Sequence, residues 1–177
     1  MSVYIKSRKE FLLDGASYFS EKSDLYLDIK DRIAGHTKLP LSMIRVCGSA
    51  YWGKSFTTEK DFSPGVSDLD VALVSDQLFV RALSEVRIKT FNFTNLTLFP
   101  TTGAPEIFQD YAYKKGIIRI DQMPKTDTKT WIDSIFQNVS KSYLQHFNNI
   151  NAVIYDSEMS FTNKQTGALL KFGGNND

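Results

Sequence analysis

The sequence predicts a mixed α/β (α+β) domain in which helices flank a small mixed sheet. Short apolar runs of strand length alternate along the chain with longer segments of helical periodicity. Of the 177 residues, 42% are hydrophobic and 23% are charged, which is the composition of a folded globular protein. Because no linker-like segment or internal repeat divides the chain, residues 1–177 are expected to form a single domain.

Helices are expected wherever apolar residues recur at intervals of three or four. In chain order, these segments are 12–19, 23–33, 76–86, 129–147 and 168–170. Ser23 is the expected N-cap of the second helix, and Gly35 is its expected C-terminal stop. Asp76 is expected to cap the third helix, whose apolar residues lie on one stripe.

Strands are expected at short apolar or β-branched runs that turn residues bound. These runs cover residues 43–47, 67–74, 116–120 and 150–155. The segment 54–66 is polar and contains Pro64-Gly65, which predicts a loop or a hairpin. Residues 90–105 alternate Phe and Leu before they end in Pro and Gly, which predicts an extended segment or a packed loop.

Composition excludes several classes of function. The 21 basic and 20 acidic residues leave a net charge of +1, so overall charge alone cannot bind nucleic acid or anionic lipid. The single cysteine, Cys47, excludes an internal disulfide and a cysteine-based zinc cluster. No apolar run approaches the roughly 18 residues that span a bilayer, and the N-terminus becomes charged too early for a signal peptide. We therefore expect a cytoplasmic protein without a membrane partner.

The chemistry-bearing residues lie in the segment 47–75. Asp68 and Asp70 are two positions apart on an expected strand, so both side chains should lie on the same face. Two carboxylates held this close repel each other unless a cation lies between them, and Mg²⁺ prefers such oxygen ligands. The pair therefore predicts a magnesium site.

Gly48 and Ser49 end the strand that precedes this pair. A glycine lets the backbone approach a phosphate closely, and the serine hydroxyl can donate a hydrogen bond to that phosphate. A phosphate-binding turn beside a metal-binding pair is the minimum needed to transfer a phosphate-containing group from a nucleoside triphosphate.

The order of these motifs resembles the nucleotidyltransferase (polymerase β-type) superfamily, in particular its small bacterial stand-alone members. Gly48, Ser49 and Gly53 match the first motif of that superfamily, and Asp68 and Asp70 match the second. The resemblance implies a nucleotidyltransferase-like sheet in which the glycine-serine turn holds the triphosphate and the aspartates hold Mg²⁺. It also implies transfer of a nucleoside monophosphate to a hydroxyl of a protein, an RNA or a small molecule. Small bacterial relatives often act as toxins or in defence against phage, which the resemblance extends to this chain as an expectation.

The superfamily usually supplies a third acid from a later strand. The corresponding position here is Asn151, which is not an acid. Asp121 is the preferred catalytic candidate because Arg119 beside it could meet phosphates, and Asp156, at a strand end, is the other candidate.

Two other interpretations stay open. The missing acid at Asn151 favours a catalytically inactive member of the same fold that binds a nucleotide or a protein partner. Residues 48–55 also match the P-loop string G-x-x-x-x-G-K-S, which would indicate a phosphotransferase. A P-loop requires a helix that begins at Lys54, and the residues that follow Lys54 predict a loop.

Overall fold

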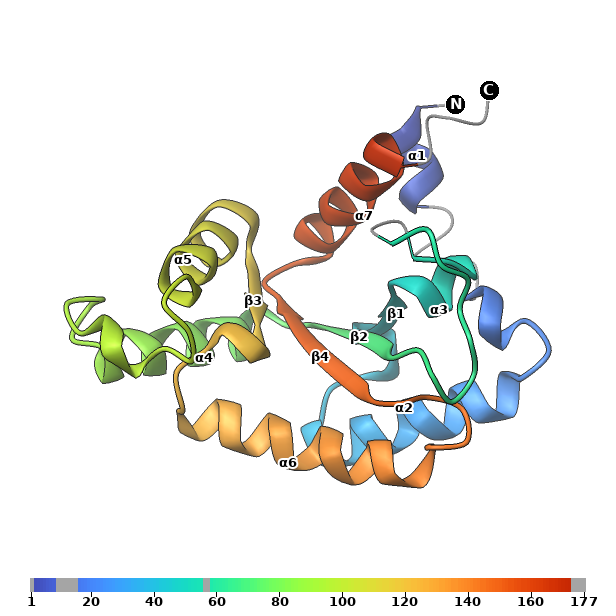
Figure 1. Ribbon diagram of the computed structural model, residues 1–177, viewed down its shortest axis with the longest axis horizontal. Helices are drawn as coiled ribbons and strands as arrows, with labels where there is room; N and C mark the ends of the chain where they lie inside the picture. The colour runs from blue at the N-terminus through green and yellow to red at the C-terminus, as the bar shows by residue number, and fades with distance from the viewer. Residues whose placement is uncertain (1, 9–15, 56–57, 173–177) are drawn as a thin grey trace.

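Four strands form one mixed sheet in the order β1-β2-β4-β3 (Figure 1). The computed structural model describes residues 2–8, 16–55 and 58–172. The strands are β1 (Ile44–Cys47), β2 (Leu69–Val74), β3 (Ile117–Arg119) and β4 (Ile150–Tyr155). The central pair, β2 and β4, is parallel, whereas β1 and β3 run antiparallel to their neighbours. The expected mixed α/β class is therefore confirmed.

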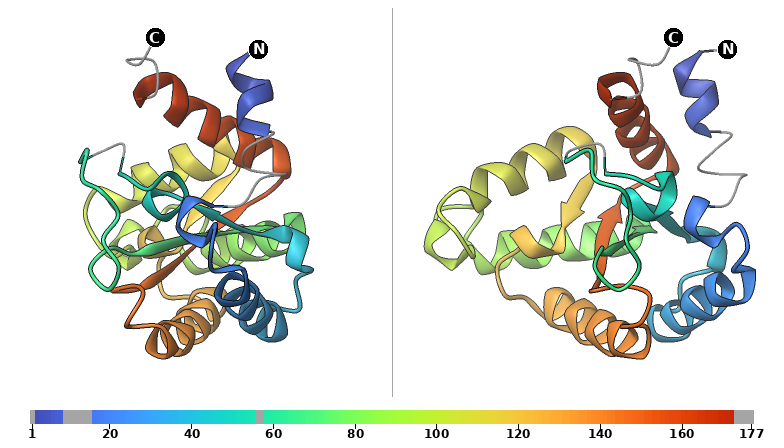
Figure 2. Two further views of the ribbon diagram at one scale, coloured as in Figure 1. Left: turned by 90° about the vertical axis from the view of Figure 1, so that its right-hand side faces the viewer. Right: turned by 45° about the vertical axis from the view of Figure 1, so that its right-hand side comes forward.

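Helices lie on both sides of this sheet. They are α1 (Val3–Arg8), α2 (Ser23–Thr37), α3 (Ser49–Trp52), α4 (Asp76–Lys89), α5 (Ala104–Lys115), α6 (Asp127–Ser142) and α7 (Glu158–Phe172). In Figure 1, α2 and α6 lie below the sheet, while α5 and α7 stand above it on opposite sides. The turned views in Figure 2 show the same arrangement. In the part of the chain that the structure describes, none of the helices combines the length and the apolar character needed to cross a membrane.

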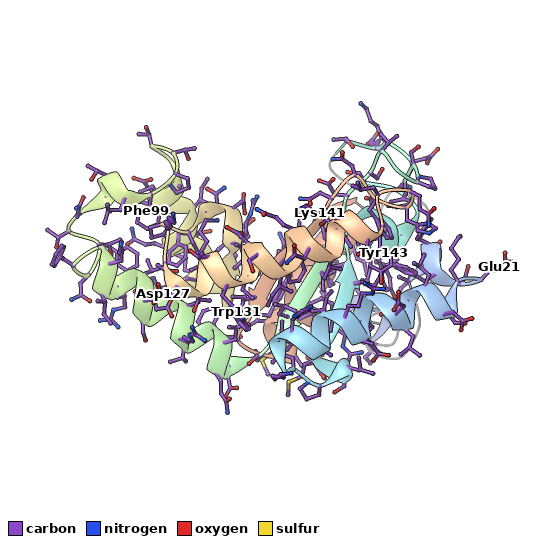
Figure 3. The ribbon with its side chains drawn as sticks, turned by 90° about the horizontal axis from the view of Figure 1, so that it is seen from below. Glu21, Phe99, Asp127, Trp131, Lys141 and Tyr143 are labelled. Carbon is purple, nitrogen blue, oxygen red and sulfur yellow. The ribbon has the colours of Figure 1, made fainter. Side chains whose placement is uncertain are left out.

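The amphipathic helix α6 packs against β4 and α2 (Figure 3). Its buried apolar side chains recur at helical spacing: Ile132, Ile135, Phe136 and Val139. Burying each of them contributes about 1.5–3 kcal/mol before the entropy cost of ordering the chain. Just beyond the helix, the Tyr143 hydroxyl donates a hydrogen bond to the Asp28 carboxylate of α2, which joins the two helices.

The ends of α2 differ from those that the sequence predicts. Ser23 is its first residue, and Lys22 takes the N-cap position without a side-chain hydrogen bond. The helix continues past Gly35 to Thr37, whose buried hydroxyl donates to the Ile33 backbone carbonyl at 2.8 Å, and the Lys38 N–H donates to the Ala34 carbonyl. The stop comes at Lys38, which adopts the left-handed conformation with a φ of 61°. Gly35 as the helix stop is therefore wrong.

Two other helix ends move by a few residues. Asp76 is the first residue of α4, and the cap is Ser75, whose side chain accepts a hydrogen bond from the Leu78 backbone N–H. The long helix expected over 129–147 is α6, which begins earlier and ends at Ser142, before a turn. The short helix expected around 168–170 belongs to the longer α7.

Helix α5 is absent from the sequence-based prediction. Residues 90–103, which precede α5, form turns around a short 3₁₀ helix, η4 (Leu96–Leu98). Of the two structures expected for residues 90–105, only the packed loop agrees with this part of the chain. Ala104, Phe108 and Ala112 are buried along one side of α5 at a spacing of four residues, which is a helical signal. For the helix expected over 12–19, residues 12–15 lie outside the described residues, and Ser17–Phe19 form a single 3₁₀ turn.

Candidate functional site

The sheet register brings together residues that are far apart in the sequence. Asp70 on β2 is paired with Cys47 on β1 and with Asn151 on β4. Gly48 directly follows Cys47, so it lies beside Asp70 at the same end of the sheet. Asp68 lies just before β2, because the strand expected over 67–74 begins at Leu69.

Gly48 allows the chain to pass very close to Asp70. Its φ of 70° and ψ of −155° belong to a backbone region that is essentially restricted to glycine. A Cβ atom at this position would lie 2.4 Å from the Asp70 Oδ2 atom, which is closer than real contacts of this kind. The sequence therefore places a glycine where any side chain would displace the carboxylate.

The two carboxylates lie within reach of one common donor. The Asn151 Nδ2 atom donates to Asp68 Oδ2 at 3.3 Å and to Asp70 Oδ1 at 3.5 Å. On the other side, the Asn148 Nδ2 atom donates to Asp68 Oδ1 at 3.0 Å. Both aspartates are partly buried and approach the same amide, but only Asp70 lies on β2, so the predicted placement of both on one strand is wrong for Asp68.

The electrostatic surroundings of Asp70 favour a nearby positive charge. Burial raises the pKa of Asp70 above its ordinary value, and the negative charge of Asp68 adds to this effect. The hydrogen bond from Asn151 and the charge of Arg119 act in the opposite direction without cancelling it. A cation at the carboxylates would relieve the repulsion between Asp68 and Asp70.

A cleft of about 1460 Å³ runs along β4, from Asn149 at this end of the strand to Asp156 beyond the other end. Gly48, Ser49, Asp70 and Asn151 line it, together with residues from α5, α6 and α7. Asp68 itself does not line the cleft and is linked to it through Asn151. The cleft therefore brings the glycine-serine turn together with Asp70, as the sequence predicts, but not with Asp68.

Asp121 lies in the same cleft, within the 3₁₀ helix η5 (Ile120–Gln122) that follows β3. Burial raises its pKa, but hydrogen bonds from Gln122 and Arg119 outweigh this effect, and the pKa is lowered overall. Arg119 Nη2 lies 2.8 Å from Asp121 Oδ2, so the carboxylate already has a cationic partner. Among the described residues, no group of three or more His, Cys, Asp or Glu side chains is arranged to hold a metal ion. The catalytic role of Asp121 stays a prediction.

Asp156 also lines the cleft, but it follows the last residue of β4, at the far end of that strand from Asn151. Its carboxylate accepts a hydrogen bond from the Ser157 hydroxyl at 2.7 Å and lies against Gly116. Asp156 is therefore a poorer candidate than Asp121 for a third acid beside Asp70.

The P-loop string does not have the backbone that a P-loop needs. The short helix α3 begins at Ser49 and ends at Trp52, before Lys54. Lys54 instead forms an isolated antiparallel bridge with Asp61. In the described part of this segment, no helix begins at Lys54.

Cys47 is buried, as the sequence predicts for a strand residue. Its Sγ atom lies 3.6 Å from the backbone oxygen of Asp70, and burial raises the pKa of the thiol far above its ordinary value. A buried thiol with a raised pKa is a poor nucleophile, so Cys47 is a packing residue of the site.

Sequence reasoning missed the role of the asparagines. Asn148 and Asn151 donate to the aspartates and Asn149 donates to Asn151, whereas the sequence interpretation treats Asn151 only as a missing acid. The signal was the clustering of three amides immediately before and within an expected strand.

Comparison of the chain with protein-family models, with curated proteins and with solved structures gives no match. The function is therefore inferred from the geometry of the site.

Proposed function

We propose that this protein is a Mg²⁺-dependent nucleotidyltransferase that moves a nucleoside monophosphate from a nucleoside triphosphate to a hydroxyl acceptor. The observation that carries the proposal is the meeting of Gly48, Asp70 and the linked Asp68 at one end of the sheet, beside a large cleft. This arrangement agrees with the order of motifs in the sequence.

The residues present fit a divalent cation. Asp68 and Asp70 offer only oxygen atoms, and both approach the same amide nitrogen. The raised pKa of Asp70 reflects a carboxylate that is crowded by burial and by its neighbour. Oxygen ligands of this kind suit Mg²⁺, which commonly binds one or two carboxylates together with substrate phosphates. When bound, the ion would lower the pKa of the acceptor hydroxyl and balance charge on the leaving pyrophosphate.

Other residues of the chain would position the substrates. Ser49 can donate its hydroxyl to a phosphate, and Gly48 keeps the backbone close to Asp70 without a side chain between them. On the cleft wall, Lys115 and Lys164 lie over the Tyr111 ring, 4.0 Å and 5.4 Å from its centroid, and add positive charge.

The cleft has room for an acceptor beside the nucleotide. A single small ligand usually occupies a pocket of about 300–1,000 Å³. The volume of about 1460 Å³ exceeds that range. This supports a two-substrate reaction in which the acceptor enters the same cleft as the triphosphate.

The test is incubation of the protein with Mg²⁺ and each of the four nucleoside triphosphates, labelled either at the α or at the γ phosphate, with protein and RNA acceptors. A nucleotidyltransferase releases labelled pyrophosphate from the γ-labelled substrate and transfers the α label to the acceptor. A phosphotransferase would instead transfer the γ label. Lys54→Ala should leave triphosphate binding largely intact, and a dominant loss of binding would favour the P-loop interpretation.

A second candidate function rests on Asn151, which stands at the position of the usual third acid. A catalytically inactive protein of this fold would bind a non-hydrolysable triphosphate and would transfer neither label. Equilibrium binding measured beside the transfer assay separates this binding module from the enzyme.

A further inference from the structure

Three asparagines form a connected set of amides around the aspartate pair. Asn148 and Asn151 donate to Asp68, and Asn151 also approaches Asp70. Behind them, the Asn149 Nδ2 atom donates to the Asn151 Oδ1 atom at 2.7 Å. The orientation of the Asn151 amide therefore depends on that of Asn149.

The orientation of Asn149 depends in turn on Ser140 of α6. The Ser140 hydroxyl lies 2.7 Å from the Phe136 backbone oxygen and 3.0 Å from Asn149 Oδ1, both of which are acceptors. It also accepts a hydrogen bond from the Ile150 backbone N–H at 2.9 Å. A hydroxyl carries one proton, so it can donate to only one of the two oxygens at a time.

This competition allows two hydrogen-bonded arrangements. When Ser140 donates to Asn149 Oδ1, Asn149 donates to Asn151, and Asn151 presents its N–H groups to the carboxylates. When Ser140 donates to the Phe136 oxygen, a half-turn of the Asn149 amide lets its Nδ2 donate to the Ser140 oxygen. Asn149 then accepts from Asn151, which presents its carbonyl oxygen to the carboxylates. An amide has both donor and acceptor ends, so both arrangements satisfy it.

The two arrangements suit different occupants of the site. An N–H group facing two carboxylates stabilises them when no cation is bound. A carbonyl oxygen facing the same carboxylates would repel them, unless a divalent cation takes it as a third oxygen ligand. A carboxylate at position 151 has no N–H group, so it could act only as an oxygen ligand of the cation.

We propose that Asn151 is a cation ligand through its carbonyl oxygen, and that the Asn149–Ser140 relay turns this amide between a donor to Asp68 and Asp70 and a ligand of the cation. The inference rests on the proposed function, because it assumes that a divalent cation binds at the aspartate pair. The inference assigns a role to Asn151, whose amide stands at the position where the resemblance implies a third acid.

The first test is the affinity for Mn²⁺ alone, without nucleotide, measured by titration of the free ion. Asn151→Leu removes the oxygen ligand and should weaken binding about 10-fold to 100-fold. Asn151→Asp supplies a charged oxygen and should strengthen binding about 10-fold or more. The control is Asn163→Leu, an exposed α7 residue that lines the same cleft and should leave the affinity unchanged.

Thermal unfolding gives a second readout that does not depend on activity. In EDTA, Asn151→Asp should unfold at a lower temperature than the wild type, because a third negative charge replaces the donor to two carboxylates. Added Mn²⁺ should raise its unfolding temperature more than that of the wild type. Asn151→Asp that binds Mn²⁺ no better than the wild type would overturn the inference, even if Asn151→Leu failed to fold.

The third readout follows the relay by NMR of side-chain amides in asparagine-labelled protein. Added Mg²⁺ should shift the signals of both Asn151 and Asn149 and leave that of Asn163 in place. A shift at Asn151 without one at Asn149 would overturn the relay.

The controls separate this inference from the proposed function. If Asp70→Asn leaves Mn²⁺ affinity unchanged, the aspartate pair holds no cation, and both fail. If Asp70→Asn abolishes Mn²⁺ binding while the Asn151 variants match the wild type, only the role of Asn151 is wrong.

Discussion

At the scale of single residues, the site depends on how closely Gly48 and Asp70 can approach. The backbone conformation of Gly48 and the space beside it are both restrictive, because its φ is 70° and a Cβ would meet the Asp70 carboxylate. Both constraints act on the same position. Neither is visible in the sequence, where Gly48 is one of 10 glycines.

Gly48→Ala should therefore damage both the fold and the site. We expect a loss of about 1–3 kcal/mol in the free energy of unfolding from backbone strain, and loss of Mn²⁺ binding as Asp70 is displaced. The matched control is Gly35→Ala, because Gly35 lies within α2 with nothing within 4 Å of its added Cβ. That control should gain about 0.4–1 kcal/mol. Denaturant unfolding measures both, and equal effects of the two substitutions would contradict this account of Gly48.

Asp70→Asn should change how stability depends on pH. The pKa of Asp70 is raised by burial and by Asp68, so the protonated side chain is favoured in the folded protein. The contribution of the protonated Asp70 side chain to the free energy of unfolding is fully present below the pKa of the unfolded state. It is lost as the pH rises through the raised pKa of the folded state. In EDTA, the stability advantage of the asparagine variant over the wild type should therefore be larger at neutral pH than at acidic pH. Unfolding curves at both pH values check the sign, and an advantage that grows toward acidic pH would refute it.

At the scale of elements, the start of α6 is held by a contact from α4. The Glu85 carboxylate accepts hydrogen bonds from the Thr128 backbone N–H at 2.7 Å and from the Thr128 hydroxyl at 2.8 Å. Burial raises the pKa of Glu85, but these hydrogen bonds and one from Arg81 outweigh it, and the pKa is lowered.

Glu85→Gln should weaken this contact between helices. The lowered pKa means that the contribution of Glu85 is present at neutral pH and is lost as the pH falls through the folded pKa. At pH 7 we expect a loss of about 0.5–1.5 kcal/mol, because the contact is only partly buried and solvent screens the charge. The difference between wild type and variant should shrink as the solution is acidified. A difference that stays constant from neutral to acidic pH in urea titrations would contradict the role of the ionised carboxylate.

The sequence predicts the elements whose pattern is local. Strand 150–155 has the predicted bounds because a β-branched run between turn residues leaves one reading. Gly35 is misleading as a stop signal because it stays within α2, whereas Lys38, a residue without the usual preference for the left-handed conformation, ends the helix. Helix α5 is missed because the Phe/Leu alternation in residues 90–105 indicates extended structure up to the start of the helix, where the four-residue spacing of buried residues begins.

The candidate site also has one feature that a local pattern predicts and others that depend on tertiary structure. The i, i+2 spacing predicts that Asp68 and Asp70 lie close together, and both approach the Asn151 amide, although only Asp70 lies on the strand. The asparagine contacts depend on the parallel pairing of β2 with β4, which joins residues about 80 positions apart. Sheet order is not encoded in any local pattern, so the hydrogen bonds of Asn151 to the aspartates could not be predicted from local spacing, although the resemblance already assigns Asn151 to the position of the third acid.

At the scale of the whole molecule, the fold leaves a cleft that runs along β4 and includes the end of the sheet at Asp70. Helices α2 and α6 lie below the sheet, and α5 and α7 stand above it on opposite sides (Figures 1 and 2). The cleft is lined from α5, α6 and α7 as well as from the strand ends, so its walls come from segments distant in sequence. The central claim is that Asp70, within this cleft, supports Mg²⁺-dependent nucleotidyl transfer.

The most direct measurement compares the Mg²⁺-dependent transfer rate of the wild type with that of Asp70→Asn. We expect the variant to lose two to four orders of magnitude in rate, about 3–5 kcal/mol, because a positioned charge is removed from the reacting phosphate's surroundings. Asp31→Asn, an exposed carboxylate on α2, should keep the wild-type rate and unfolding temperature, and Asp70→Asn in EDTA at neutral pH should unfold at no lower a temperature than the wild type. A wild-type protein without Mg²⁺-dependent transfer from any of the four nucleoside triphosphates, or an Asp70→Asn variant at the wild-type rate, would contradict the claim.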